Sequence, residues 1–149
     1  MNKNQRVNNI RTSTRDIVQH LGYLNNLFAS IGSLSQCYAL QKLEKTPLTL
    51  QELTKELGLE QSTVSRLAKE LVDKKGYCFY QPNGQDGRSH FLKLTDLGKK
   101  KLREIHTTAT QQVQTALSQL TEAEQEAVAR GLDLYATALK NKEENETHG

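Results

Sequence analysis

The chain has 149 residues, a net charge of +3, and only three Phe, five Tyr, no Trp and two Pro. This length fits one domain with appended segments, and a composition rich in Leu, Gln, Lys and Glu favours helices over a β-sandwich or a barrel. The first residues lack a secretory h-region and cleavage site, and no apolar run could cross a membrane, so we expect a soluble, cytoplasmic protein without a membrane partner.

Basic charge is concentrated in the middle of the chain. Residues 49–103 carry 11 basic and 7 acidic side chains, whereas residues 121–149 carry 3 and 7. This distribution favours a middle region that binds a polyanion and a C-terminal region with another role. The two Cys are far apart and the four His lack metal-ligand spacing, so we expect no disulfide, metal or cofactor.

The region before Gly32 carries the pattern of a long amphipathic helix. Its apolar positions are separated by three or four residues, which is the spacing of one helical face: Ile17, Leu21, Leu24, Phe28 and Ile31. Gly32 is expected to end this helix. Residues 1–32 therefore form the predicted N-terminal helical segment.

Two shorter helices are predicted next. Ser33 with Gln36 has the spacing of a capping box, and the helix that it starts should end before Pro47. Thr49 with Glu52 repeats this spacing, and Gly58 is a typical helix end.

Residues of about 60–75 have the pattern of a recognition helix. Four apolar residues are expected to face inward: Leu59, Val64, Leu67 and Leu71. The outward set consists of hydrogen-bonding residues: Gln61, Ser62, Thr63, Ser65, Arg66 and Lys69. Two helices joined by a tight turn indicate a helix-turn-helix whose second helix enters the DNA major groove. One of the three hydroxyl residues should cap this helix, while Arg66 suits guanine and Gln61 suits adenine.

A β-hairpin is predicted at about 77–94, because the hydropathy pattern changes to a period of two after Gly76. The segments YCFYQ and HFLKL are the expected strands, and PNGQDGRS is the expected turn. This hairpin would be the wing of a winged-helix domain at residues 33–98.

Two long helices are predicted over residues 95–141. Thr95 should cap the first, whose apolar side continues for several turns: Leu102, Ile105, Ala109, Val113, Ala116 and Leu120. Thr121 with Glu124 should cap the second, with a similar apolar side: Val128, Leu132, Tyr135 and Leu139. Residues 142–149 are expected to be a disordered tail.

This order of elements resembles the MarR family of winged helix-turn-helix transcriptional regulators. The resemblance covers about residues 10–140, and its most specific part is the wing-to-helix signature: Asp86, Arg88, Leu94, Thr95 and Gly98. It implies a mainly α fold with a small β-hairpin wing, in which dimerisation helices at both ends flank the winged helix-turn-helix domain.

The resemblance also implies that the protein binds double-stranded DNA. An Arg at a hairpin tip can enter the narrow minor groove, which gives Arg88 this role, and Asp86 would orient it. The first wing strand carries Phe79, Tyr80 and Gln81 where charged residues are common in the family, and Gly87 stands where a second Arg is frequent. Tyr80 is therefore a candidate for a phosphate hydrogen bond.

A homodimer that represses nearby promoters is the expected assembly and activity. The apolar sides of the first helix and the last two exceed what one small domain can cover, and such surfaces mark interfaces. Two-fold symmetry places the recognition helices about 34 Å apart, which predicts a pseudo-palindromic operator.

Family members commonly respond to a small phenolic or anionic ligand bound between the dimerisation helices and the winged domain. The resemblance implies that this ligand would be lined by His20, Tyr23, Leu24, Leu27, Cys37 and Tyr38. For each residue taken singly, packing in the core is the competing interpretation.

Three other functions have to be weighed. A redox-responsive regulator would need a reactive thiol at Cys37 or Cys78. A protein-interaction module would be expected to lack the basic excess around residues 61–101. No catalytic motif or catalytic residue is found in the sequence, so an enzyme is not expected.

Overall fold

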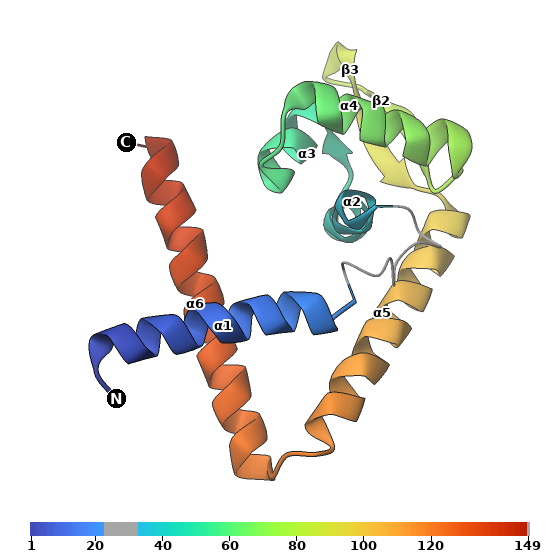
Figure 1. The fold of residues 1–149 in the computed structure, drawn as a ribbon. Coiled ribbons are helices and arrows are strands. Elements are labelled where there is room, and N and C mark those ends of the chain that lie inside the picture. Colours follow the sequence, from blue (N-terminus) through green and yellow to red (C-terminus); the bar gives the residue numbers. More distant parts are fainter. Residues whose placement is uncertain (23–32, 149) are drawn as a thin grey trace. The chain divides into compact units, whose positions relative to one another are not determined.

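The computed structural model describes residues 1–22 and 33–148, and it is mainly helical with a small antiparallel sheet (Figure 1). This is the fold class that the sequence predicts. The chain divides into two compact units, Met1–Thr107 and Thr108–Gly149.

The first helix, α1 (Lys3–His20), begins and ends earlier than the sequence pattern predicted. Asn2 and Gln5 form a reciprocal capping box at its start, and Leu21 caps its end. Gly22 then takes a φ of 88°, which is the left-handed region that glycine adopts easily. The prediction of one helix from Ile17 through Leu21 to Gly32 was therefore wrong, and its positions Leu24, Phe28 and Ile31 lie outside the described residues.

The next two helices begin where their capping residues predicted. Ser33 Oγ accepts a hydrogen bond from the Gln36 backbone NH at the start of α2 (Leu34–Lys45). Thr49 Oγ1 accepts one from the Glu52 NH at the start of α3 (Leu50–Leu57), which ends at Gly58 with a φ of 65°. Each hydroxyl satisfies a backbone donor that the first turn of a helix leaves free.

The recognition helix consists of α4 (Gln61–Lys69) and a π-helical turn, η2 (Glu70–Lys74). Its N-cap is Glu60, which makes no side-chain capping bond, so the prediction that Ser62, Thr63 or Ser65 caps the helix was wrong. The left-handed Gly58 ends α3 early enough for α4 to start at Gln61, which puts all three hydroxyls inside the helix.

The wing spans the predicted residues, but its strands are longer and its turn is shorter than predicted. Strand β2 (Cys78–Asn83) pairs with β3 (Asp86–Leu94), and Gly84 and Gln85 alone form the turn, so the predicted eight-residue turn was wrong. The first strand, β1 (Leu48–Thr49), was not predicted. It pairs with β3 in the order β1-β3-β2, which leaves β2 at an edge, where Pro82 removes no inner-strand hydrogen bond.

Two residues of the wing-to-helix signature, Thr95 and Gly98, connect the wing to α5 (Asp96–Leu117). Thr95 Oγ1 donates to the Gly76 carbonyl oxygen at 2.7 Å and accepts from the Gly98 NH at 3.0 Å. A Cβ atom on Gly98 would lie 2.1 Å from the Tyr77 carbonyl oxygen, so only glycine fits there. Thr95 thus caps α5, as predicted, and also holds the base of the wing.

The core of the first unit lies between α2, α3, α4, the sheet and the start of α5. Its largest fully buried side chains are Leu40, Leu53, Val64, Leu71, Leu92 and Leu102. Among the four residues predicted to face inward from the recognition helix, Leu59 is the exception. It is 38% exposed because it lies in the turn after Gly58 rather than on the helix.

The last helix, α6 (Glu122–His148), starts with the predicted capping box. Thr121 N donates to Glu124 Oε1 at 2.9 Å, and Glu124 N donates to Thr121 Oγ1 at 3.2 Å. The helix continues through the predicted disordered tail, which was therefore a wrong prediction. Lys142 and Glu146 are paired at 3.6 Å across one turn there, and Glu and Lys are good helix formers.

Candidate nucleic-acid interface

The recognition helix presents a polar face to solvent because its apolar face is fixed in the core. Val64 and Ala68 are completely buried and Leu67 is 7% exposed, which sets the rotation of α4. The outward residues predicted from the sequence divide into two groups. Gln61, Ser62, Arg66 and Lys69 are exposed, while Thr63 and Ser65 are half-buried. The exposed group is therefore the part of this face that a ligand can reach.

A broad open cavity of about 760 Å³ joins the recognition helix to the wing. Gln61 borders it from α4 and Tyr80 from β2, so the fold brings together two predicted site residues that are far apart in the sequence. Six further polar residues line the same cavity and were not predicted to belong to a site: Thr49, Gln51, Glu52, Lys55, Ser89 and His90. Gln51 lies in the first turn of α3, directly after the predicted cap, and this position was the only signal for it in the sequence.

Tyr80 is suited to donate a hydrogen bond. Tyr80 lies on the edge strand β2 and is 39% exposed. Partial burial, followed by the nearby Asp73 and Cys78, raises the pKa of its phenol. The hydroxyl group therefore keeps its proton at neutral pH and can donate to an anionic oxygen.

The wing tip is organised by Asn83. Its Oδ1 accepts from the Gln85 NH at 3.1 Å, and its Nδ2 donates to Ser89 Oγ at 3.1 Å. The backbone of β3 then places Asp86 directly after the turn and Arg88 two residues further on. The side chains of Asp86 and Arg88 lie outside what the structure describes, so their predicted roles stay predictions.

The recognition helix has a second polar hollow near its C-terminal end. Arg66 and Lys69 line it together with Glu70, Asp73 and Lys74, and its volume is about 290 Å³. Glu70 is held from the core side by Gln36, whose Nε2 donates to Glu70 Oε2 at 2.7 Å. This bond fixes the junction of α4 and η2 against α2.

Three of the six residues predicted to line a ligand site, His20, Cys37 and Tyr38, lie in the described part of the chain. Cys37 is buried in the core at 2% exposure, whereas its neighbour Tyr38 is 44% exposed, so the two side chains point in different directions from α2. His20 is exposed in the last turn of α1. Tyr23, Leu24 and Leu27 lie outside the described residues.

Both thiols are shielded from reaction. Cys37 and Cys78 are free and buried. Burial raises the pKa of the Cys37 thiol, which Gln41 partly offsets with a hydrogen bond, and burial raises the pKa of Cys78 to about 12. The thiolate is the reactive form, so these surroundings disfavour the redox alternative.

Neither a metal-binding cluster nor a membrane-spanning helix is found within residues 1–22 and 33–148. No group of three or more His, Cys, Asp or Glu side chains in these ranges could hold a metal ion. None of the helices in these ranges combines the length and the apolar character that a membrane span requires.

Comparison with known proteins agrees with this arrangement. A family model described as the MarR family matches residues 33–89. The HTH-type transcriptional regulator TcaR of Staphylococcus aureus is 31% identical over 137 residues, which are 91% of this chain and 87% of TcaR.

Two solved structures extend the comparison to the fold. YusO of Bacillus subtilis has a TM-score of 0.73 at 25% identity, over 93% of this chain and 99% of its own. FabT of Streptococcus pneumoniae, solved in complex with DNA, has a TM-score of 0.74 at 25% identity with the same coverage. Given the helix-turn-helix, the wing and a relative that matches over nearly its whole length, the chain belongs to the MarR family of transcriptional regulators.

Proposed function

We propose that the protein binds double-stranded DNA sequence-specifically as a homodimer and represses nearby promoters. The observation that carries this proposal is the cavity that Gln61 of the recognition helix and Tyr80 of the wing border together. A helix in the major groove and a wing beside the adjacent backbone need such a continuous exposed surface.

The two parts of this surface have different tasks. Arg66 is exposed on α4 and suits bidentate recognition of guanine, while Gln61 suits adenine. Tyr80 would donate a hydrogen bond to a phosphate, and Arg88 would enter the minor groove. The helix then reads the sequence and the wing adds affinity that depends little on it.

The proposed dimer is supported by apolar side chains of α1, α5 and α6 that remain partly exposed. On α6 the exposed fractions of Val128, Leu132 and Leu139 are 40%, 48% and 46%. Val113 on α5 is 50% exposed, and Ile10 on α1 is 49% exposed. Surfaces of this kind usually pair with a second copy in symmetric oligomers.

The decisive experiment is selection of bound DNA from a random pool, followed by fluorescence anisotropy on the selected site at two salt concentrations. Arg66→Ala should cost about 1 to 3 kcal/mol on that site and relax the preference at one base position. Arg88→Ala should weaken binding to all sequences and reduce the dependence of affinity on salt.

Arg130→Ala is the matched control, because Arg130 lies on α6, is not among the residues assigned to this surface, and its loss removes the same charge. Binding of Arg66→Ala and Arg88→Ala at the strength of Arg130→Ala would contradict the assigned surface. Equal affinity for selected and random DNA would contradict sequence specificity. No DNA binding at all would favour a protein-interaction module instead.

Repression is tested separately with a reporter gene placed behind the selected site. Expression should fall when the protein is present, and a rise would identify an activator. Relief by a small phenolic or anionic ligand at the site predicted from the sequence stays a prediction, since Tyr23, Leu24 and Leu27 lie outside the described residues.

A further inference from the structure

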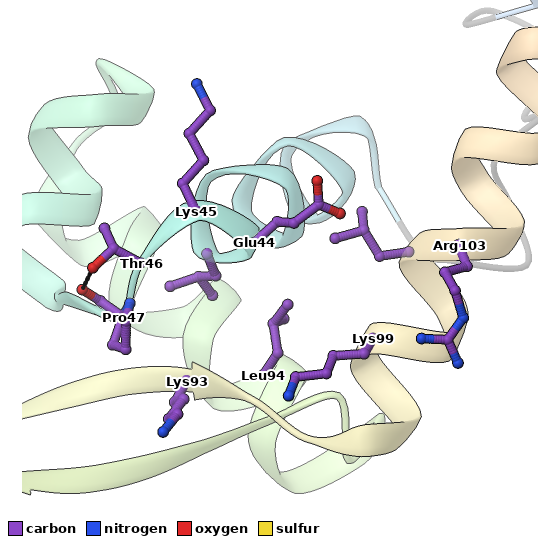
Figure 2. A pocket seen from close by; sticks show the side chains of 10 residues that line it. Glu44, Lys45, Thr46, Pro47, Lys93, Leu94, Lys99 and Arg103 are labelled. Atoms are coloured by element: carbon purple, nitrogen blue, oxygen red, sulfur yellow. Dashed lines mark hydrogen bonds between the residues drawn. The ribbon is translucent and has the colours of Figure 1, made fainter.

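Helix α2 contacts other elements of the first unit at both of its ends. Its C-terminal end lines a cavity of about 360 Å³ together with the end of β3 and the first turns of α5 (Figure 2). Its first turn contacts the recognition helix instead, through the side chain of Gln36. This contact connects the core of the winged domain to the proposed DNA interface.

Gln36 is a buried polar residue in a mostly apolar core. It is 5% exposed, and Ser33 Oγ accepts a hydrogen bond from its backbone NH, so the cap of α2 fixes its position. Within the described residues its Oε1 atom has no hydrogen-bond partner. An unpaired buried acceptor costs free energy, so an apolar side chain of the same length would suit the core better. The stability of the core therefore does not explain this glutamine.

The amide group of Gln36 binds a charged residue of the recognition helix. Its Nε2 donates to Glu70 Oε2 at 2.7 Å, which is the short distance typical of an ionised acceptor. The backbone of Glu70 is held as well, because its carbonyl oxygen accepts from the Lys75 NH at 3.0 Å where η2 begins. The Glu70 carboxylate is therefore held towards α2.

Cations surround this carboxylate. Arg66, Lys69 and Lys74 line the same hollow as Glu70. Arg66 and Lys74 are each four residues from Glu70, which is the spacing at which opposite charges pair on a helix. Within residues 1–22 and 33–148, however, none of these three cations forms a salt bridge with Glu70 or with Asp73, the other acid of the hollow. Their charges remain available to a bound polyanion.

We propose that Gln36 is a positioning residue for the DNA interface, an inference that rests on the proposed DNA binding. By holding the Glu70 carboxylate towards α2, Gln36 keeps this negative charge from pairing with the cations of the hollow. Without this hydrogen bond the carboxylate would turn into the hollow and compete with DNA phosphates for Arg66 and Lys74. A glutamine suits this task because its amide group donates a hydrogen bond and adds no charge.

The test is a double-mutant cycle on DNA affinity, measured by fluorescence anisotropy on the selected site. Gln36→Met keeps the length of the side chain and removes the donor, so affinity should fall by about fivefold or more, within the range of coupling between residues that share a hydrogen bond. Glu70→Gln removes the competing charge. It should therefore raise affinity by about fivefold more in the Gln36→Met protein than in the parent.

The free energy of unfolding separates positioning from a merely structural role. Gln36→Met removes the unpaired acceptor together with the donor, so its stability in urea should equal or exceed that of the parent. A structural role predicts the opposite pattern, in which stability falls and Glu70→Gln does not restore DNA binding.

Gln41→Met is the matched control. Gln41 also lies on α2, but its Nε2 donates to Cys37 Sγ at 3.5 Å and not to the recognition helix. This variant should therefore bind DNA as tightly as the parent.

Several outcomes would overturn the proposal. They are DNA binding of Gln36→Met at the strength of the parent, an equal effect of Glu70→Gln in both backgrounds, or an equal loss of affinity in Gln41→Met. If the parent bound DNA and the two substitutions were additive, this inference alone would be wrong. If the parent bound no DNA, the proposed function would be wrong and this inference with it.

Discussion

The winged domain and the long helices at the two ends of the chain use their apolar residues in opposite ways. In the winged domain the apolar side chains of three helices and the sheet bury one another, and Leu40, Leu53, Leu71 and Leu92 are completely buried. On α6 no described side chain is buried, although apolar residues recur along its length. The first region therefore holds its own core, while the second leaves apolar residues exposed for the proposed dimer interface.

Thiol labelling tests the buried core of the winged domain and has the largest expected effect. At pH 8 a thiol with its usual pKa is partly ionised, whereas the pKa of about 12 at Cys78 leaves almost no thiolate. A difference of three pKa units slows alkylation by roughly a thousandfold relative to the unfolded chain. Peptide mass spectrometry after iodoacetamide treatment measures the rate at each cysteine.

The control for labelling is Asn141→Cys, which puts a thiol on the exposed end of α6. This cysteine should react at the rate of a free thiol. Rapid labelling of Cys78 in the folded protein would show that the core opens readily, and it would restore the redox alternative.

A charge placed on the apolar side of α6 tests whether these exposed residues form the proposed dimer interface. Leu132→Glu should raise the dissociation constant of the dimer by roughly a hundredfold, since an unpaired carboxylate in an interface costs about 3 kcal/mol or more. Sedimentation equilibrium measures the change. Thr137→Glu adds the same charge away from the apolar side and should leave the dimer intact; equal dissociation in both variants would contradict the assigned interface.

A methyl group added at the base of the wing should destabilise the winged domain, whereas the same change on α6 should not. Gly98→Ala places a Cβ against the Tyr77 carbonyl oxygen and should lower the free energy of unfolding by about 2 to 3 kcal/mol. Gly131→Ala meets nothing within 4 Å and should raise it by up to about 1 kcal/mol, since alanine favours a helix. Urea denaturation followed by circular dichroism compares the two variants.

The smallest expected effect concerns the start of α6. Two bonds from Thr121 lower the pKa of Glu124 from its usual value of 4.5, so the folded state favours the carboxylate. This stabilisation is fully present above about pH 4.5 and is lost as the pH falls through the lowered pKa. In thermal unfolding, Glu124→Gln should be slightly less stable than the parent at pH 7 and equal to it near pH 2. A difference that stayed constant with pH would contradict a role for the charge.

Local signals in the sequence were sufficient for the elements whose ends are set by neighbouring residues. Ser33, Thr49, Thr95 and Thr121 each cap the helix that they were predicted to cap, because a capping bond spans only three residues. The same reasoning could have found the start of α1, where Asn2 and Gln5 have the capping-box spacing.

Features formed between distant segments were harder to predict. The two-residue β1 exists only because β3 lies beside it, and the cavity that Gln61 and Tyr80 border cannot be seen without the fold that joins its sides. The exposed face of the recognition helix was predictable because its apolar period is local. The separation of Cys37 from Tyr38 was predictable in principle as well, since adjacent residues on a helix point about 100° apart.

The contacts among Thr95, Gly76 and Gly98 connect the wing firmly to α5, so the wing should follow the movement of this helix. Two hydrogen bonds and a direct contact between backbones leave little room for rotation at this joint, so β2 and β3 should turn together with the first turns of the helix. A strand of six residues is about 20 Å long, so a turn of about 10° at the joint moves the wing tip by about 3 Å. That distance is the length of one hydrogen bond, so a small angular change in α5 is enough to make or break a contact at the far end of the wing.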